Sequence, residues 1–254
     1  MKSSSTLKST LPAKHGLYDP AFEHDACGVG FVANIKNRKS HDIIEKGMEI
    51  LLRLTHRGAT GADPREGDGA GILIQIPDGF FRAVTPELHI ELPKEGEYGV
   101  GMVFLPQNDD YRATCQDITE QTIAEEGQIF LGWRDVPTNT ARADLPESVT
   151  CCEPVIRQVF IGKGENCADQ DAFERKMYVI RRVARNRIDD LGQSGPARFY
   201  FASMSSRTIV YKGMFLSHQV GAYYEDLQDT RLTSALALVH QRFSANTFPA
   251  WELA

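Results

Sequence analysis

The stretch HDACGVGFV at residues 24–32 constrains this chain most, because it places a single cysteine directly before a glycine-flanked apolar run. We expect Cys27 to open a strand over residues 27–35 rather than to lie inside a helix. Gly28 and Gly30 carry no side chains, so the backbone or a substrate can approach the strand closely. A free cysteine in such a strand is either an inert core residue or a reactive thiol.

Removal of the residues before Cys27 would give its thiol a base of its own. A thiol reacts as the thiolate and has a pKa of about 8.5, whereas a free α-amino group has a pKa of ~7.7–8.0 and is partly neutral near neutral pH. A terminal cysteine therefore carries a covalently positioned base, as N-terminal threonine nucleophiles do. Residues 1–17 are rich in Ser, Thr and Lys, and no acidic residue precedes Asp19. We therefore predict that residues 1–26 are a removable propeptide or a disordered leader, and that Cys27 becomes the terminal nucleophile.

The composition is that of a globular protein in a reducing compartment. With 254 residues, 42% of them hydrophobic and 24% charged, the chain is long enough for one domain with a sizeable core or for two small ones. The net charge of -6 offers no basic footprint for nucleic acid, and no apolar run reaches the ~18 residues of a membrane span. The five cysteines, at positions 27, 115, 151, 152 and 167, include no Cys-x-x-Cys spacing. They predict neither a disulfide framework nor a metal site, and they favour a cytoplasmic location.

Hydrophobic periodicity predicts a mixture of helices and strands. Strands are expected at residues 27–35, 72–76, 98–105, 128–133, 155–161, 199–204, 208–211 and 235–244. Helices are expected at residues 40–54, 79–84, 109–126 and 171–190. Residues 135–153 are expected to form a loop. From the residues alone, this order indicates an α+β, layered fold.

The helix expected at residues 171–190 is strongly amphipathic. Its apolar stripe has five members: Phe173, Met177, Ile180, Val183 and Ile188. Its other side carries four arginines, which we expect to face solvent: Arg181, Arg182, Arg185 and Arg187.

A glycine-rich loop, EGDGAG at residues 66–71, precedes the strand expected at 72–76. It has neither the G-x-x-x-x-G-K nor the G-x-G-x-x-G spacing, and a strand follows where a phosphate-binding motif needs a helix. We therefore expect this loop to pack tightly against the nucleophile strand rather than to bind a nucleotide.

Five ordered motifs give the chain a resemblance to a known family. They are ACGVGF at residues 26–31, LTHRGA at 54–59, GDGAGIL at 67–73, SSRTIVYKG at 205–213 and QRFSANTFP at 241–249. From about Tyr18 to its last residue the chain resembles the start of the glutamate synthase large subunits, which implies a class II (N-terminal nucleophile) glutamine amidotransferase domain over residues 27–254. The resemblance also implies the four-layer αββα sandwich of N-terminal nucleophile hydrolases, in which two antiparallel sheets lie between helices.

The resemblance assigns roles to four residues of this sequence. Cys27 would attack the side-chain amide of glutamine to form a thioester, with its own α-amino group as the base. Arg242 would bind the α-carboxylate of glutamine, a task that suits a planar guanidinium with two parallel donors. Arg57 and Gly58 would shape the glutamine pocket. From the residues alone, Arg57 caps a helix or lies in solvent, and Arg242 is a structural arginine with a buried partner.

Two departures from the family pattern stand out. Ala245 occupies a position where the family usually has threonine. The Asn-Gly pair that supplies the family's oxyanion donors does not occur in this sequence, and neither does the later aspartate that holds the substrate amino group. We therefore expect the sandwich to be incomplete at the C-terminus and the chain alone to have little or no glutaminase activity.

The resemblance also implies what the parent enzyme contains. It would pass ammonia to 2-oxoglutarate, with FMN, an iron–sulfur cluster and the synthase domain beyond residue 254 and no cofactor within this chain. The expected partners are glutamine, the synthase domain of the same parent chain and a small NAD(P)H-oxidising subunit. Two alternatives stay open: another N-terminal nucleophile amidotransferase or amide hydrolase with a different acceptor, and a non-catalytic domain that keeps the fold.

Overall fold

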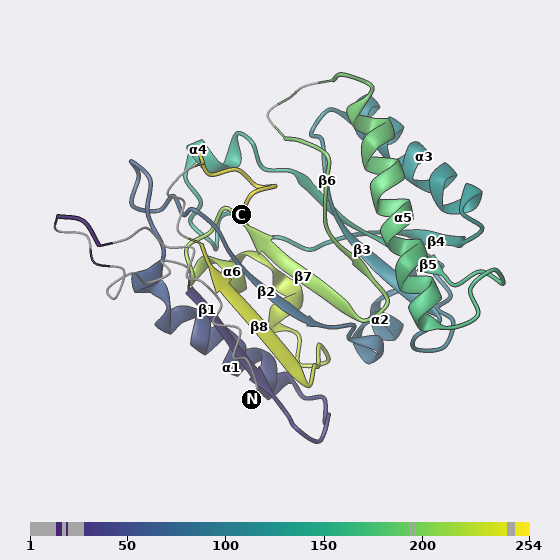
Figure 1. Cartoon of the computed structure of the whole chain (residues 1–254), viewed down its shortest axis with the longest axis horizontal. Coiled ribbons are helices and arrows are strands. Elements are labelled where there is room, and N and C mark those ends of the chain that lie inside the picture. The colour runs from purple at the N-terminus through teal and green to yellow at the C-terminus, as the bar shows by residue number, and fades with distance from the viewer. Residues whose placement is uncertain (1–13, 17–18, 20–27, 194, 196, 243–246) are drawn as a thin grey trace, which may run out of the picture.

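Two antiparallel four-stranded sheets form the frame of the molecule (Figure 1). The computed structural model describes residues 14–16, 19, 28–193, 195, 197–242 and 247–254. The first sheet contains, in spatial order, β1 (Gly28–Ala33), β8 (Leu236–Gln241), β2 (Ala70–Gln75) and β7 (Thr208–Gly213). The second contains β4 (Ile129–Asp135), β5 (Val155–Gly162), β3 (Tyr98–Leu105) and β6 (Tyr200–Ser205).

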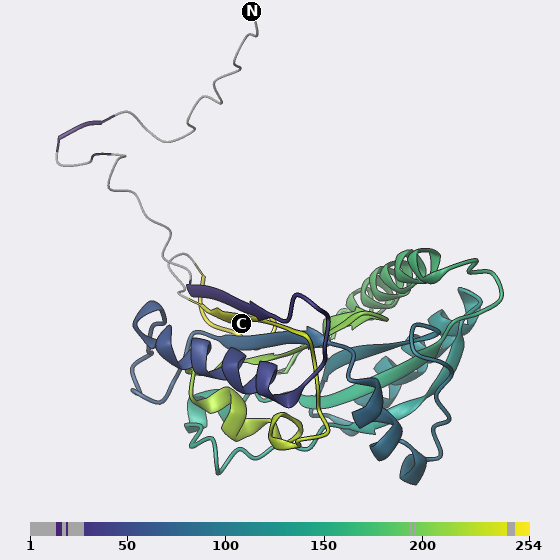
Figure 2. The same ribbon diagram turned by 90° about the horizontal axis from the view of Figure 1, so that it is seen from below.

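Helices lie on opposite sides of the two sheets. Figure 2 shows α1 (His41–Arg53) below the strands and α5 (Gln170–Asp189), which packs beside α3 (Asp109–Glu125), above them. The shorter helical segments are η2 (Thr55–Arg57), α2 (Asp78–Val84), η3 (Pro86–Leu88), α4 (Glu147–Thr150), α6 (Gln219–Tyr223) and η4 (Glu225–Gln228). The predicted α+β class, with two antiparallel sheets and helical layers, is confirmed.

The predicted helices and strands are found close to their expected bounds. The predicted loop at residues 135–153 is wrong in part, because it contains α4, and no helix was expected where α6 lies. Both are single turns that depend on tertiary packing. Val149 of α4 is buried, and its carbonyl accepts a hydrogen bond from Trp251 at 3.2 Å. Four of the five residues of α6 are buried, so α6 lacks the polar face by which periodicity reveals a helix.

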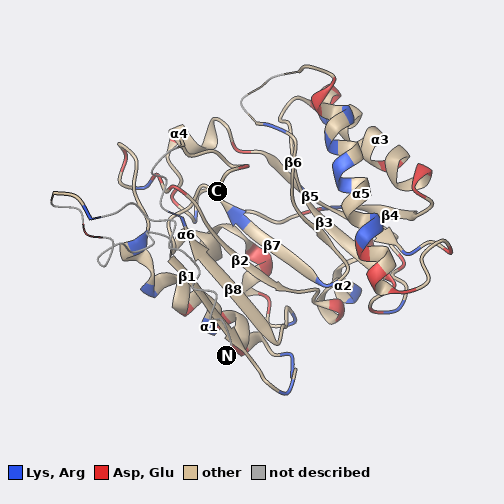
Figure 3. Cartoon of the chain, in the orientation of Figure 1, with Lys and Arg blue, Asp and Glu red and all other residues tan. Residues whose placement is uncertain are grey.

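The amphipathic prediction for α5 holds with two corrections. Ala184, rather than Val183, is buried with the rest of the apolar stripe. Basic residues follow the helix (Figure 3), but only Arg182 and Arg187 of the four arginines are exposed. The guanidinium of Arg185 lies 5.9 Å from the ring centroid of Tyr200 on β6 and donates to Asp189 at 2.6 Å.

Both faces of the second sheet are covered. Every residue of β3 is buried, and its side chains divide between two apolar clusters. Val100, Met102 and Phe104 belong to the cluster that continues under the first sheet to α1. Val103 and Leu105 belong to the cluster beneath α3 and α5. The centre of the second sheet therefore lies inside the protein, whereas its edge strand β4 exposes Ile129 and Phe130.

The first sheet is covered by α1 on one face only. Glycines let that helix and the turn after it lie directly on β1: a Cβ at Gly30 would lie 2.4 Å from Ile50 Cγ2, and one at Gly28 would lie 2.8 Å from Arg57 Cβ. The predicted close approach at these glycines is confirmed. On the opposite face, the side chains of Val29 and Phe31 are 59% and 70% exposed.

A buried polar network joins the two sheets. Arg134 of β4 donates to both carboxylate oxygens of Asp226 on η4, at 2.8 and 2.7 Å, and also to Gln158 Oε1 on β5 at 2.9 Å. The hydroxyl of Tyr211 on β7 donates to Asp226 at 3.0 Å. The arginine–aspartate pair is buried, and Tyr211 connects it to β7, the edge strand of the first sheet. The pair therefore holds the second sheet against the first.

Candidate functional site

The predicted site residues in the described part of the chain gather at one end of the first sheet. Arg57 and Gly58 follow α1, and Arg242 follows β8. β8 pairs with β1 in a register that places Gln241 opposite Gly28. Cys27, which precedes Gly28 in the sequence, lies outside the described residues. Three of the four predicted residues therefore surround the start of the strand that follows the predicted nucleophile.

The turn after α1 is held by backbone hydrogen bonds and by close packing. The Arg57 amide donates to the Leu54 carbonyl at 2.7 Å, and the Gly58 amide donates to the Thr55 carbonyl at 3.2 Å. A Cβ at Gly58 would lie 2.3 Å from Gln241 Nε2. Glycine is therefore needed at position 58 because a side chain would not fit. Its backbone conformation does not require glycine, since a φ of -90° is accessible to any residue.

Sequence reasoning missed Gln241, which connects the turn to β8. Its side chain is buried against Gly58, and Nε2 lies 3.5 Å from the Gly69 carbonyl. Its Oε1 has no hydrogen-bond partner among the described residues. The only sequence signal for Gln241 is its position beside Arg242 in the QRF motif. A glutamine inside an apolar strand gives no indication that it contacts a residue 183 positions earlier in the chain.

The glycine-rich loop supports Arg242. The Gly69 carbonyl accepts from the Arg242 backbone amide at 2.8 Å, and Gly69 adopts a φ of +144°, a region that glycine alone enters freely. The predicted tight packing is found, but β8 separates this loop from β1 in the sheet. Its hydrogen bonds therefore go to the strand that carries the arginine.

The Arg242 guanidinium is half-buried and is bound by neutral groups. Nη1 donates to the Asp68 carbonyl at 3.4 Å, and Nη2 donates to Thr247 Oγ1 at 2.5 Å. Within the described ranges it forms no ion pair with a carboxylate. A guanidinium has five N–H donors, so donors remain for a ligand carboxylate. Asp68 is buried, so its contact with Arg242 also fits the structural alternative, an arginine with a buried partner.

Two further basic groups lie on the sheet face opposite α1. Lys212 of β7 and His240 of β8 both pair with Gly71 of β2 in the strand registers, and the three residues help to line a cavity of about 200 Å³. Burial lowers the pKa of Lys212 to about 8; Glu252 opposes this shift, and Arg242 adds to it. Burial also lowers the pKa of His240, and so do Arg242 and Lys212. Burial and the neighbouring Arg242 therefore both disfavour the charged forms of Lys212 and His240.

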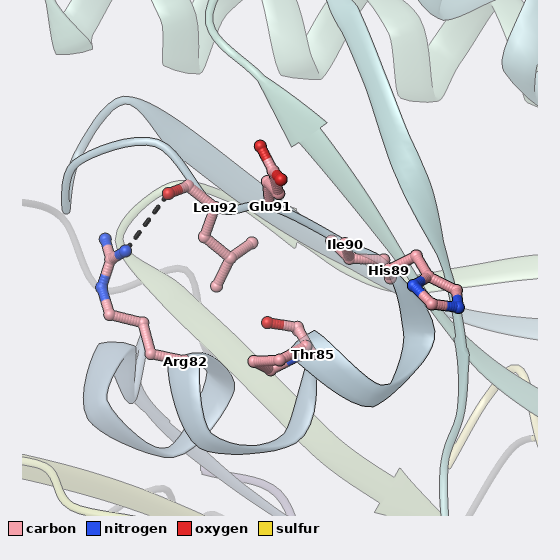
Figure 4. A pocket seen from close by; sticks show the side chains of 7 residues that line it. Arg82, Thr85, His89, Ile90, Glu91 and Leu92 are labelled. Carbon is pink, nitrogen blue, oxygen red and sulfur yellow. Dashed lines mark hydrogen bonds between the residues drawn. The ribbon is translucent and has the colours of Figure 1, made fainter.

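A second cavity, of about 360 Å³, lies far from this cluster, between α2 and the segment after η3 (Figure 4). Arg82, one of its lining residues, donates to the carbonyls of Leu92 and Pro93 and to the Asp78 carboxylate. It contains none of the predicted site residues.

The other described thiols are buried or partly buried, except Cys151, which is exposed. Cys115 and Cys167 are buried, and burial raises the pKa values of Cys115 and Cys152 to about 11. Among the residues that the structure describes, no three His, Cys, Asp or Glu side chains are grouped so that they could hold a metal ion. The helices within the same ranges are too short or too polar to cross a membrane.

Comparison with known proteins places this geometry in context. The family model described as glutamine amidotransferases class-II matches residues 27–254. The chain is 50% identical over 244 residues to the glutamate synthase (NADPH) large chain of Bacillus subtilis (strain 168), a match that covers 96% of this chain and 16% of that protein. It is 40% identical over 243 residues to the glutamate synthase (NADPH) large chain of Azospirillum brasilense, which covers 93% of this chain and 15% of the relative.

The similarity extends to plants. The chain is 36% identical over 253 residues to the ferredoxin-dependent glutamate synthase 1, chloroplastic/mitochondrial, of Arabidopsis thaliana, with 100% of this chain and 15% of the relative covered. The chain thus spans 15–16% of the length of these three relatives.

Proposed function

Because this chain belongs to the class-II glutamine amidotransferases, we propose that it hydrolyses the side-chain amide of glutamine through Cys27. The Cys27 thiolate attacks the amide carbon, the carbon–nitrogen bond breaks, and ammonia leaves as a thioester forms. Water then cleaves the thioester, which releases glutamate and restores the thiol. The freed α-amino group takes the thiol proton and delivers it to the leaving nitrogen.

The assembly around the start of β1 is the observation that carries this proposal. Arg57 and Gly58 come from the turn after α1 and Arg242 from the end of β8, and all three lie beside Gly28 or its partner Gln241. Gly28 follows Cys27 directly. A nucleophile at this position would have a carboxylate-binding group and a shaped turn next to it, as a glutamine site requires.

Arg242 binds the α-carboxylate of glutamine in this proposal. Its guanidinium is fixed by Asp68 and Thr247, so little side-chain entropy is lost when a carboxylate binds. Arg57 and Gly58 shape the pocket wall. The contact between Gly58 and Gln241 holds that wall on β8.

The relatives suggest where the ammonia goes. All three are named glutamate synthases, and we propose that a synthase domain of the same parent chain receives the ammonia and adds it to 2-oxoglutarate. The FMN and iron–sulfur chemistry of that reaction, and the exchange with a small NAD(P)H-oxidising subunit, belong in this proposal to residues outside this chain.

Labelling with a glutamine-analogue electrophile tests the proposal. The full-length protein is treated with 6-diazo-5-oxo-norleucine, and the modified peptide is identified by mass spectrometry. We expect stoichiometric labelling of Cys27, protection by glutamine and no labelling of Cys27→Ala. The exposed Cys151 is an internal control for unselective alkylation. Labelling that glutamine does not prevent, or that falls on Cys151 alone, would contradict the proposal and favour a non-catalytic domain that keeps the fold.

A further inference from the structure

Three points of contact tie the last described segment, residues 247–254, to residues in or next to the strands of both sheets. Thr247 Oγ1 accepts from Arg242 Nη2. Trp251 is buried between Phe104 and Phe215, with ring centroids 5.9 and 5.2 Å away. The third point is Lys212 of β7, whose ammonium donates to the carbonyls of Glu252 at 3.0 Å and Ala254 at 2.7 Å. The segment therefore runs from the guanidinium of the site to a half-buried lysine.

Lys212 is suited to hold a backbone rather than an anion. Its Nζ lies 4.7 Å from the ring centroid of Tyr200, and in the described part of the chain it forms no ion pair. An ammonium has three donors and no acceptor, so two carbonyls and an aromatic face match its capacity. Hydrogen bonds from a charged donor are roughly twice as strong as neutral ones.

We propose that Lys212 is a positioning residue for glutamine binding: by holding residues 247–254 at one end, it keeps Thr247 in place to fix the guanidinium of Arg242. This inference rests on the proposed role of Arg242 in binding the α-carboxylate. Without Lys212 the segment keeps its Trp251 anchor but loses both carbonyl bonds beyond it. Arg242 then samples more orientations, and binding of the carboxylate costs more entropy.

The same contact makes glutamine binding sensitive to alkaline pH. The pKa of Lys212 is about 8, so the ammonium that binds the carbonyls is lost as the pH rises through this value. The charged groups around it are the Glu252 carboxylate of the held segment, Arg242 directly after β8, and Arg181 of α5. The titratable His240 of β8 also faces it, with a lowered pKa. Because only Glu252 is anionic, removing its charge shifts the loss of the ammonium to lower pH.

Steady-state kinetics of the full-length protein test this proposal. For Lys212→Met we expect the KM for glutamine to rise about tenfold, with kcat within about threefold of the wild type, because the lost interaction is one of binding. Lys212→Arg keeps a charged donor and restores most of the affinity. It also removes the rise in KM near pH 8, since a guanidinium stays charged there.

Two further variants distinguish a positioning role of Lys212, exerted through Arg242, from a general contribution to the stability of the fold. Glu252→Gln keeps the carbonyl that Lys212 binds, so its KM at pH 7 stays within about twofold, while the alkaline rise in KM begins at lower pH. In an Arg242→Lys background, Lys212→Met changes KM less than about twofold, because the group through which it acts is already gone. Additive effects of the two substitutions would overturn the proposal, and so would an equal fall of kcat in Lys212→Met.

A measurement independent of turnover distinguishes this inference from the proposed function. The Leu253 amide donates to the Ala250 carbonyl at 2.9 Å, so hydrogen exchange of the peptide over residues 247–254 reports whether the segment is held. Exchange should be about tenfold faster in Lys212→Met and unchanged in Glu252→Gln. Unchanged exchange in Lys212→Met would show that Lys212 does not hold the segment, and would overturn the proposal. Full glutaminase activity in Cys27→Ala would instead remove the proposed function and leave the exchange result standing.

Discussion

The two sheets have the same number of strands and the same antiparallel pairing, yet they use their faces differently. The second sheet is covered on both faces, and every residue of its strand β3 is buried. The first has one face on α1 and one exposed, with Val29 and Phe31 outside. The predicted site residues that the structure describes, Arg57, Gly58 and Arg242, lie at one end of the first sheet. A strand that is covered on both sides supports the structure, and one with an accessible end and face has room for a ligand.

The largest effect should follow from removing the nucleophile beside the first sheet. In Cys27→Ala we expect glutamine-dependent glutamate synthesis by the full-length enzyme to fall by more than about 10³-fold, because no thioester can form. Synthesis from added ammonia should persist, since it needs no amide hydrolysis. Loss of both activities in a folded variant would indicate a structural role for Cys27. The difference between the two sheets would then have no link to glutamine hydrolysis.

The second-largest effect should follow from breaking the link between the sheets. Arg134→Met leaves Asp226 buried without its charge partner, which should lower the free energy of unfolding by about 3–5 kcal/mol. The matched control is Arg157→Met in the half-exposed pair with Asp135, where the cost should stay below about 1 kcal/mol. Urea titration of both variants measures the difference. Equal costs would mean that the buried pair does not hold the sheets together.

The turn beside β8 should tolerate even one methyl group poorly. Gly58→Ala places a Cβ 2.3 Å from Gln241 Nε2, so either the turn or the glutamine must move, at about 1–3 kcal/mol. We expect the KM for glutamine to rise as the pocket wall shifts. Gly79→Ala in α2, where a Cβ meets nothing within 4 Å, should keep wild-type kinetics. Unaltered kinetics in both variants would separate the turn from the site.

Arg242→Lys should affect binding more than chemistry. The lysine keeps the charge but loses the two-pronged contact with a carboxylate. The α-carboxylate is remote from the amide that is cleaved, so we expect a rise of about tenfold in the KM for glutamine and a smaller fall in kcat. Steady-state kinetics at saturating concentrations of the other substrates measure both constants. An unchanged KM would place Arg242 outside the pocket.

The smallest effect should come from the exposed face of the first sheet. Phe31→Ser should change the free energy of unfolding by no more than about 0.5 kcal/mol, because the ring is already in water. Phe160→Ala, in the buried second sheet, should cost about 3–5 kcal/mol. A large cost for Phe31→Ser would show that this face is covered in solution and would erase the contrast between the sheets.

Local residue patterns were sufficient to predict most helices and strands, but not the tertiary contacts that these elements make. The 3.6-residue period of α5 and the apolar run of β3 predict their bounds because those patterns depend on neighbouring residues alone. The short helix α4 was missed, because a single turn gains its stability from Val149 and Trp251, about a hundred residues apart. The strand expected at residues 27–35 is found as β1, but its apolar residues Val29 and Phe31 are exposed rather than buried.

The site divides in the same way. The motifs pointed to Cys27, Arg57, Gly58 and Arg242 through their resemblance to the family, and the roles of these four residues stay predictions. Only the tertiary structure brought Gln241 against Gly58 and Lys212 to the backbone of residues 247–254. Those contacts join residues far apart in the chain, and a glutamine or lysine in an apolar strand looks the same whether or not it has such a partner. Sequence alone therefore predicted which groups react and bind, and packing decided which residues lie against them.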